Sequence, residues 1–339
     1  MKRHTIHTTL LMLLLLLANS CKREEVRSRQ SMYYWRTTLV WGDEECKRAD
    51  SMEMQTLYLR LFDVVRDASE PSLGLRPEAS LRFPDKEAAV RLKGSVERIV
   101  PVVFLAPNTI SQADEGKMPD LASLLLKRID QMTEKNGLGK CQEIQIDFDW
   151  AQSNGKVYFT LLECLSDKLH SEGRALSTTI RLHQLALQAP PVDRGVLMCY
   201  NTGKIQQIDE PNSILTQEAV EPYLRYLKAY SLPLTLALPR FGWNVVFREG
   251  EFAFIAPGLE LADTTAFAQV DDTHWRARTY QAVPGAASAT TQSIQRILPG
   301  DLIRREDSDN QLNSLILKTM QKKRPDIVRE VVWYGGSLQ

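Results

Sequence analysis

The stretch EIQIDFDW, residues Glu143–Trp150, alternates polar and apolar side chains over the length of one β-strand. Side chains two residues apart share a face, so Asp147 and Asp149 point one way while the Ile, Phe and Trp side chains point the other. Carboxylates inside an apolar strand are costly unless they are hydrogen-bonded, paired or used. The stretch therefore predicts a buried strand that carries two carboxylates toward a site.

Seven further segments have the pattern of strands, and helix-like segments alternate with them. The eight candidates are Tyr33–Val40, Leu57–Val64, Ile99–Ala106, Glu143–Trp150, Ala175–His183, Gly195–Thr202, Leu232–Phe241 and Ile327–Tyr334. Alternation of strands and helices predicts an α/β fold with a parallel sheet, and eight strands are the number that closes a (β/α)8 TIM barrel. Residues 32–339 are predicted to form this one domain.

Several helices of the predicted barrel have clear ends in the sequence. They are Leu121–Glu134 between Pro119 and Gly137, Lys156–His170 before Gly173, and Gln217–Tyr230 after Thr216 as its cap. Only Gln184–Arg194 separates the fifth and sixth strands, and the chain stops just past the eighth. We therefore expect the outer ring of helices to be incomplete.

Residues 242–325, between the seventh and eighth strands, form a connection far longer than an ordinary loop. Asn244–Phe247 and Phe252–Ile255 flank a turn-like stretch and predict a hairpin. A Thr/Ala/Ser-rich loop and two helical segments are expected to follow. The sequence thus predicts an inserted α+β segment, of the kind that acts as a lid or subdomain.

The first 20 residues have the pattern of an export signal. Lys2 and Arg3 precede the apolar run Leu10–Leu17, which is too short to span a bilayer as a folded helix. The run ends just before Cys21 and resembles the lipobox of bacterial lipoproteins, whose cysteine is lipidated, with residues 21–31 as a polar tether. The resemblance implies a membrane-anchored protein of the cell envelope, at the outer membrane and exposed on the periplasmic side or the cell surface. The alternative is an ordinary secretory signal in which the cysteine is incidental.

The composition excludes several classes of function. The chain has 42 basic and 42 acidic residues and no basic stripe with interleaved aromatics, so nucleic acid is not an expected partner. Its histidines and cysteines show no metal-ligand spacing, and we expect neither a metal nor another cofactor. Four cysteines lie beyond the leader, Cys46, Cys141, Cys164 and Cys199, and we interpret them as mostly buried free thiols. We expect a monomer.

In a barrel of this kind the site lies at the C-terminal ends of the strands. The polar and aromatic residues predicted there are Asp63, Asp147, Asp149, Arg181, His183, Tyr200, Asn201, Arg240, Trp243 and Trp333. Sugar sites use this mixture, because aromatic planes stack on pyranose C–H faces while charged groups bind hydroxyls. The alternative for Asp147 and Asp149 is a structural pairing with Arg60 or Arg181.

These motifs resemble the chitinase-like family 18 glycosidases. Their fourth strand carries Asp-x-x-Asp-x-Asp-x-Glu, to which Asp147-Phe-Asp149 is similar, and their sixth carries Met-x-Tyr-Asp, to which Met198-Cys-Tyr-Asn201 is similar. A Trp on the last strand and an insertion after the seventh also agree. An uncharacterised bacterial family of glycoside-hydrolase-like lipoproteins resembles the chain more closely, in residues 145–149 and in Leu-Ser-x-Thr at 176–179. The resemblance implies a barrel that binds glycans at its mouth.

Two residues depart from the glycosidase pattern. Ala151 stands where the family's acid glutamate belongs, and Asn201 stands where the family has an aspartate. Because the family's substrate supplies its own acetamido nucleophile, the protein must supply one strong general acid. Either Asp149 or Asp63 takes that role, or hydrolysis is lost. We therefore expect a lipid-anchored barrel that engages glycans without the usual acid, with a glycosidase using Asp149, supported by Asp147, as the alternative.

Overall fold

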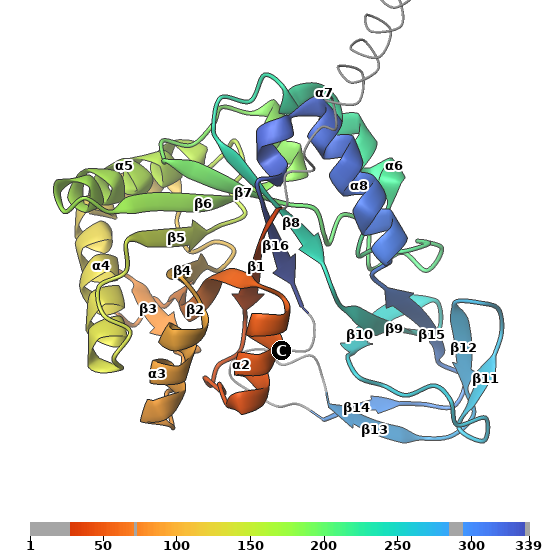
Figure 1. Ribbon diagram of the computed structural model, residues 1–339. Coiled ribbons are helices and arrows are strands. Elements are labelled where there is room, and N and C mark those ends of the chain that lie inside the picture. The colour runs from red at the N-terminus through yellow and green to blue at the C-terminus, as the bar shows by residue number, and fades with distance from the viewer. Residues whose placement is uncertain (1–27, 71–72, 285–293, 336–339) are drawn as a thin grey trace, which may run out of the picture.

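The computed structural model describes residues 28–70, 73–284 and 294–335, in which the chain forms a closed barrel with an inserted sheet (Figure 1). The barrel strands are β1 (Arg29–Tyr34), β2 (Met54–Arg66), β4 (Arg98–Leu105), β5 (Glu143–Asp147), β6 (Ala175–Arg181), β7 (Arg194–Met198), β8 (Leu234–Pro239) and β16 (Glu330–Tyr334). They pair in parallel in this order, and β16 pairs with β1, which closes the ring. The short strand β3 (Leu75–Glu78) adds to β2 antiparallel. The predicted (β/α)8 barrel is confirmed.

The alternation read from EIQIDFDW is present in the folded strand. Ile144, Ile146 and the following Phe148 are buried in the core that the barrel shares with its helices. Gln145 faces the barrel interior, where its Oε1 accepts a hydrogen bond of 2.7 Å from the hydroxyl of Tyr33. β5 thus divides its side chains between two buried environments, as the period-2 pattern predicts.

Helices cover the outer face of the barrel unevenly. They are α2 (Asp43–Ser51), α3 (Lys86–Ser95), α4 (Met118–Lys135), α5 (Gly155–Ser171), α6 (Gln217–Val220) and α7 (Leu224–Leu227), with the 3-10 helices η1 (Gln112–Lys117), η2 (Leu182–Ala186) and η3 (Glu221–Tyr223). The predictions for α4 and α5 are confirmed. The single helix predicted over 217–230 is wrong. It breaks into α6, η3 and α7, because Pro222 has no N–H to donate within a helix. Only η2 lies between β6 and β7, as expected.

The insertion after β8 is a small antiparallel domain that ends in a helix. Its strands are β9 (Gly242–Arg248), β10 (Glu251–Ala256), β11 (Phe267–Gln269), β12 (His274–Ala277), β13 (Gln281–Pro284), β14 (Ile294–Ile297) and β15 (Leu302–Asp307), followed by α8 (Asn310–Lys323) and η4 (Pro325–Val328). The predicted hairpin is confirmed as β9 and β10. The expected Thr/Ala/Ser-rich loop falls on residues 285–293, outside the described residues. Strands β11 to β15, which were not predicted, come before the helical segments α8 and η4. Strands β11 to β14 have three or four residues each, which is too few to show a clear period in the sequence.

A network of opposite charges lies at the N-terminal end of the barrel interior. Arg194 on β7 contacts Glu143 at 2.8 Å and Glu330 at 3.3 Å, and Arg98 contacts Glu330 at 3.4 Å. Arg194 also donates a hydrogen bond of 2.7 Å to the hydroxyl of Tyr58. Burial alone would lower the pKa of Arg194, but Tyr58 and the two carboxylates raise it. The floor of the barrel is therefore polar and internally paired, which leaves the opposite end for a site.

The leader, Cys21 and the first part of the predicted tether lie outside the described residues. β1 begins at Arg29 rather than Tyr33, so the strand includes residues that the sequence assigned to the tether. In the described part of the chain, no helix is both long and apolar enough to cross a membrane. The four described cysteines are free thiols, of which Cys141 and Cys199 are buried and Cys46 and Cys164 are half-buried.

Candidate functional site

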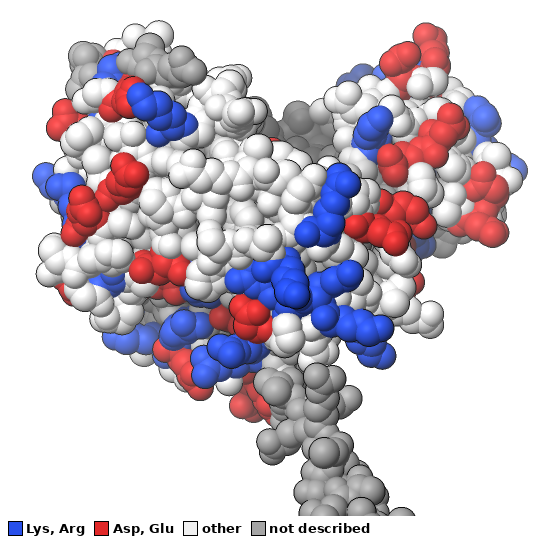
Figure 2. Space-filling view, turned by 90° about the horizontal axis from the view of Figure 1, so that it is seen from above, with Lys and Arg blue, Asp and Glu red and all other residues white. Residues whose placement is uncertain are grey.

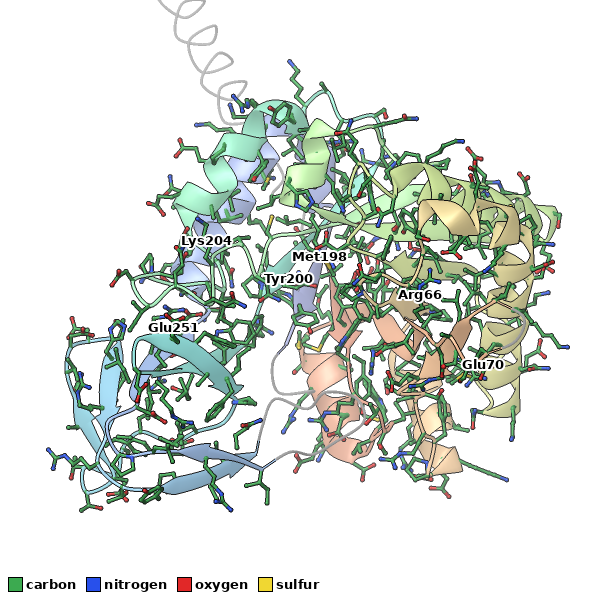
Figure 3. The ribbon with its side chains drawn as sticks, turned by 180° about the vertical axis from the view of Figure 1, so that it is seen from behind. Arg66, Glu70, Met198, Tyr200, Lys204 and Glu251 are labelled. Atoms are coloured by element: carbon green, nitrogen blue, oxygen red, sulfur yellow. The ribbon has the colours of Figure 1, made fainter. Side chains whose placement is uncertain are left out.

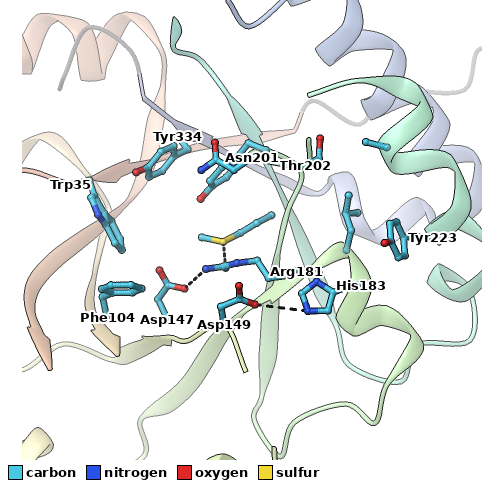
Figure 4. Close-up of a pocket in the computed structure, with 14 residues that line it drawn as sticks. Trp35, Phe104, Asp147, Asp149, Arg181, His183, Asn201, Thr202, Tyr223 and Tyr334 are labelled. Carbon is cyan, nitrogen blue, oxygen red and sulfur yellow. Dashed lines mark hydrogen bonds and ion pairs between the residues drawn. The ribbon is translucent and has the colours of Figure 1, made fainter. Parts of the chain in front are cut away.

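A cavity of about 460 Å³ opens at the C-terminal ends of the barrel strands (Figure 4). Its charged lining residues are Asp147, Asp149, Arg181 and His183, and its aromatic lining residues are Trp35, Phe104, Tyr200, Tyr223 and Tyr334. These side chains come from strands or loops widely separated in the sequence. Figure 3 shows Met198 and Tyr200 at the end of the barrel that faces the insertion. The cavity thus lies at the mouth that the sequence predicted.

Asp147 is held in the wall of the cavity by buried partners. One of its oxygens accepts hydrogen bonds from Thr179 at 2.5 Å and from Arg181 at 3.1 Å, and its side chain is only 4% exposed. Burial opposes the charge on Arg181, but Asp147 and its neighbours raise the pKa of the guanidinium. Asp147 and Arg181 are therefore a charged pair that shapes the cavity, which is the structural alternative left open by the sequence.

Asp149 lies just beyond the end of β5 and projects into the cavity. Its side chain is 58% exposed, and its Oδ1 lies 3.8 Å from Nε2 of His183. The buried side chain of Gln184 holds this corner, because its amide donates to Asp149 at 3.4 Å and to the carbonyl of Trp150 at 2.8 Å. Asp149 is thus the carboxylate at the mouth that remains available to a ligand.

Aromatic rings form the opposite wall. Tyr200 and Tyr334 stack with centroids 4.5 Å apart and planes at 8°, and Trp35 meets Tyr334 edge-on at 6.1 Å. Burial raises the pKa of Tyr200, and burial with the nearby Asp147 raises that of Tyr334 to about 12, so both are neutral phenols. The buried hydroxyl of Tyr200 has no hydrogen-bond partner among the described residues. A buried hydroxyl in that state costs free energy unless water or a ligand binds it.

No protein-family model and no curated protein sequence matches the chain. Solved structures do match it. The chitinase of Chromobacterium violaceum ATCC 12472 is 12% identical with a TM-score of 0.57, over 92% of this chain and 95% of that one. The spore cortex-lytic enzyme SleL of Bacillus cereus is 16% identical with a TM-score of 0.53, over 92% and 71% of the two chains. SleL of Bacillus megaterium QM B1551 is 13% identical with the same TM-score, over 90% and 70%.

The chain has a chitinase-like TIM-barrel fold. Identities of 12 to 16% establish the fold alone, so the function of the cavity depends on the residues that line it. In this chitinase-like barrel Ala151 is exposed, does not line the cavity, and uses its backbone N–H to bind Asn154 at 2.8 Å. Asn201 does line the cavity, with a φ of 53° that Asn tolerates better than most residues.

Six of the ten predicted site residues line the cavity, namely Asp147, Asp149, Arg181, His183, Tyr200 and Asn201. The other four lie elsewhere. Asp63 forms a buried ion pair with Arg60 three residues earlier on β2, and burial raises its pKa against the effect of that arginine. Trp243 belongs to β9 instead of a loop, and its indole N–H donates to Glu306 at 2.7 Å. It is therefore a packing residue of the insertion.

The last strand places Tyr334, and not Trp333, at the mouth. Trp333 points to the outside of the barrel, where its indole donates to Gln30 at 2.8 Å and Arg240 stacks on its ring at 4.7 Å. Successive residues of a strand face opposite sides, so Tyr334 takes the inward position. This corrects the predicted placement of both Trp333 and Arg240.

Besides Tyr334, three aromatic residues of the cavity are absent from the ten predicted site residues. Trp35 falls inside the predicted first strand, but it is half-buried just past the C-terminal end of β1, where barrels of this kind place ligand contacts. Phe104 lines the cavity two residues after Val102 on β4, whose side chain faces the barrel interior, so strand alternation would have found it. Tyr223 lies in η3, and no local pattern marks it. Within the described residues, no group of three or more His, Cys, Asp or Glu side chains could hold a metal ion.

Proposed function

We propose that this protein is an exported, lipid-anchored glycan-binding barrel that holds an oligosaccharide at its mouth without family-type hydrolysis. The observation that carries the proposal is a cavity in which half-buried aromatic rings face the exposed carboxylate Asp149. Trp35, Phe104 and Tyr334 offer apolar planes that suit the C–H faces of a sugar ring. Asp149, His183 and Asn201 offer hydrogen-bonding groups for its hydroxyls, so the lining of the cavity has both kinds of contact that a sugar uses.

Three features argue against hydrolysis of the family type. Ala151, in the place of the acid glutamate, carries no proton donor and lies outside the cavity. Asp147 is already bound by Thr179 and Arg181. Asp149 is 58% exposed, so the described residues do not enclose it as they would the acid of an active site that excludes water. The mouth therefore supports binding better than cleavage.

The second candidate function is an active glycosidase with Asp149 as the general acid. One observation favours it. Asp149 is the cavity carboxylate that no arginine pairs with in the described structure, and a bound sugar would cover it and exclude water. In that reading the hydroxyl of Tyr200 would position the sugar.

Replacement of Asp149 by Asn separates the two functions. We expect the wild type and Asp149→Asn to bind the same oligosaccharides on a glycan array that includes chito-oligosaccharides, and neither to release a fluorophore from glycoside reporters. Cleavage by the wild type that Asp149→Asn abolishes, with binding retained, would establish the glycosidase. If the wild type binds no oligosaccharide, both glycan functions are wrong. Ala151→Ser, which changes an exposed neighbour outside the cavity, is the matched control and should behave as the wild type.

Tyr200→Phe tests whether a ligand binds the buried hydroxyl. Because this hydroxyl has no partner among the described residues, its removal should leave the midpoint of thermal unfolding unchanged or slightly higher. Affinity for the bound oligosaccharide should fall about tenfold, the value of one hydrogen bond to a buried group. Calorimetric titration measures the affinity. The control is Tyr230→Phe, because Tyr230 lies outside the cavity and its buried hydroxyl also has no hydrogen-bond partner among the described residues. Equal affinity of Tyr200→Phe and the wild type would remove Tyr200 from the site.

The lipid anchor is tested at Cys21, which lies outside the described residues. We expect cells that produce the full chain to incorporate labelled palmitate into it and to retain it in the membrane fraction. Cys21→Ser should abolish the label, because the thiol that receives the lipid is gone. Cys46→Ser, which changes a half-buried thiol of the barrel, should leave the label intact. A wild-type protein that is secreted without label would instead support an ordinary signal peptide.

A further inference from the structure

Exposed basic side chains gather at the N-terminal end of the barrel, around the start of β1 and the end of α8. We call this surface the basic face, and it consists of Arg29, Lys228, Lys322, Lys323 and Arg329. Figure 2 looks onto the ends of α7 and α8 and shows an area of Lys and Arg side chains with few Asp and Glu among them. The whole chain has no net charge, so this area is a local concentration of charge.

Backbone contacts hold the parts of the basic face together. The N–H of Arg29 donates to the carbonyl of Arg329 at 2.9 Å, which joins β1 to the turn before β16. The guanidinium of Arg324, next to Lys323, donates to the carbonyl of Tyr230 at 2.8 Å and to that of Leu227 at 3.4 Å. These two carbonyls flank Lys228. The five basic side chains thus belong to one rigid surface and not to separate loops.

Acidic groups near the basic face neutralise little of its charge. Asp326 pairs with Arg324 at 3.3 Å, and Glu330 is buried in the barrel floor with Arg194 and Arg98. Glu53 precedes the residue of β2 that pairs with Gln30, so it lies at the edge of the face beside Arg29. Among these described acids, Asp326 is already paired and Glu330 is buried, so Glu53 is the exposed one that lies at the margin of the five basic side chains.

Helix ends explain only part of this arrangement. Lys322 and Lys323 occupy the last turn of α8, where a helix favours cations. Arg29 begins a strand, Arg329 follows a 3-10 turn, and Lys228 follows an α7 of four residues, which has little dipole. Helix stabilisation therefore does not explain why Arg29, Lys228 and Arg329 lie beside the two lysines.

The basic face and the mouth lie at opposite ends of the barrel, because the first is at the N-terminal ends of β1 and β16 and the second at the C-terminal ends of the strands. Cys21 precedes Arg29 by eight residues. Eight residues span at most about 28 Å when fully extended. A lipid on Cys21 would therefore keep this end of the barrel within a short distance of the membrane.

We propose that the basic face docks on the anionic phosphate headgroups of the membrane, so that the barrel stands with its mouth facing away from the lipid. A basic cluster near an anionic membrane gains roughly fivefold in affinity for each Lys or Arg at the surface. The lipid anchor proposed above supplies the proximity, and the basic face supplies the orientation. The docking itself rests on charge alone and does not require a glycan or an acyl chain.

The test measures binding of unlipidated protein to vesicles. Residues 22–339 include every described strand and helix and can be purified without the leader. We expect this protein to sediment with vesicles of phosphatidylcholine and phosphatidylglycerol, not with phosphatidylcholine alone, and to be released as salt screens the charges. The double variant Lys322→Glu with Lys323→Glu should lower the affinity for the anionic vesicles on the order of a hundredfold, since two attractive contacts become repulsive.

Lys86→Glu with Lys127→Glu is the matched control, because both side chains are exposed on other helices and the change in net charge is the same. It should keep most of the binding, and circular dichroism should show both double variants folded. Equal losses in the two double variants would mean that net charge alone matters and would overturn the proposal, as would a wild type that ignores anionic vesicles. The assay uses no glycan and no acyl chain. A protein that does not bind the vesicles could therefore still bind glycans, and a protein that binds no glycan could still bind the vesicles.

Discussion

Arg194→Met is expected to lower the free energy of unfolding by about 3 to 5 kcal/mol, the usual cost of removing one partner from a buried charge network. Arg194 is 18% exposed, and it contacts Glu143 and Glu330, which are 9% and 10% exposed. After the substitution Arg98, which is 41% exposed, is the one cation among the described residues that still contacts the two buried carboxylates. Urea unfolding followed by tryptophan fluorescence measures the loss.

The control for Arg194 is an ion pair on the surface. Arg305 and Asp307 are 55% and 57% exposed and lie 2.8 Å apart, so Arg305→Met should cost less than about 1 kcal/mol. Glu143→Gln in the Arg194→Met background should recover part of the loss, because it removes one of the uncompensated charges. An Arg194→Met protein as stable as the wild type would show that the floor network is open to solvent.

The sequence was sufficient for the barrel because its strands carry a strong local signal. The alternation in EIQIDFDW corresponds to a real division between barrel interior and helix core, and the ends of α4 and α5 follow from their proline, glycine and apolar spacing. The helix predicted over 217–230 was wrong because Thr216 marks only its start, where α6 does begin, while Pro222 interrupts the helix after one turn. The strands of the insertion were missed because they are stabilised by pairing with distant segments, such as β9 with β15.

The site was harder to predict than the fold, and the errors have a common cause. Asp63, Trp243 and Trp333 were chosen by residue type and by nearness to a strand end. Their actual partners are Arg60, Glu306 and Gln30, of which the last two come from distant parts of the chain. Side chains of a strand alternate between the two faces, so either Trp333 or Tyr334 faces the barrel interior. The sequence of the predicted strand did not show which of the two does. Asp149 was correctly placed because it directly follows a strand whose alternation was unambiguous.

Arg181→Met is expected to cost about 2 to 4 kcal/mol of stability and to abolish oligosaccharide binding, because it leaves the carboxylate of Asp147 uncompensated in the cavity wall. Asp147 is 4% exposed and would keep only the hydrogen bond from Thr179. Adding Asp147→Asn should restore most of the stability, since the neutral amide needs no guanidinium. If Asp147 serves only to shape the wall, the double variant should also regain binding. If stability returns and binding does not, the charged pair itself contacts the sugar. Denaturant unfolding and calorimetric titration of the same three proteins separate these outcomes, and an Arg181→Met protein with unchanged stability and binding would show that the pair does not support the mouth.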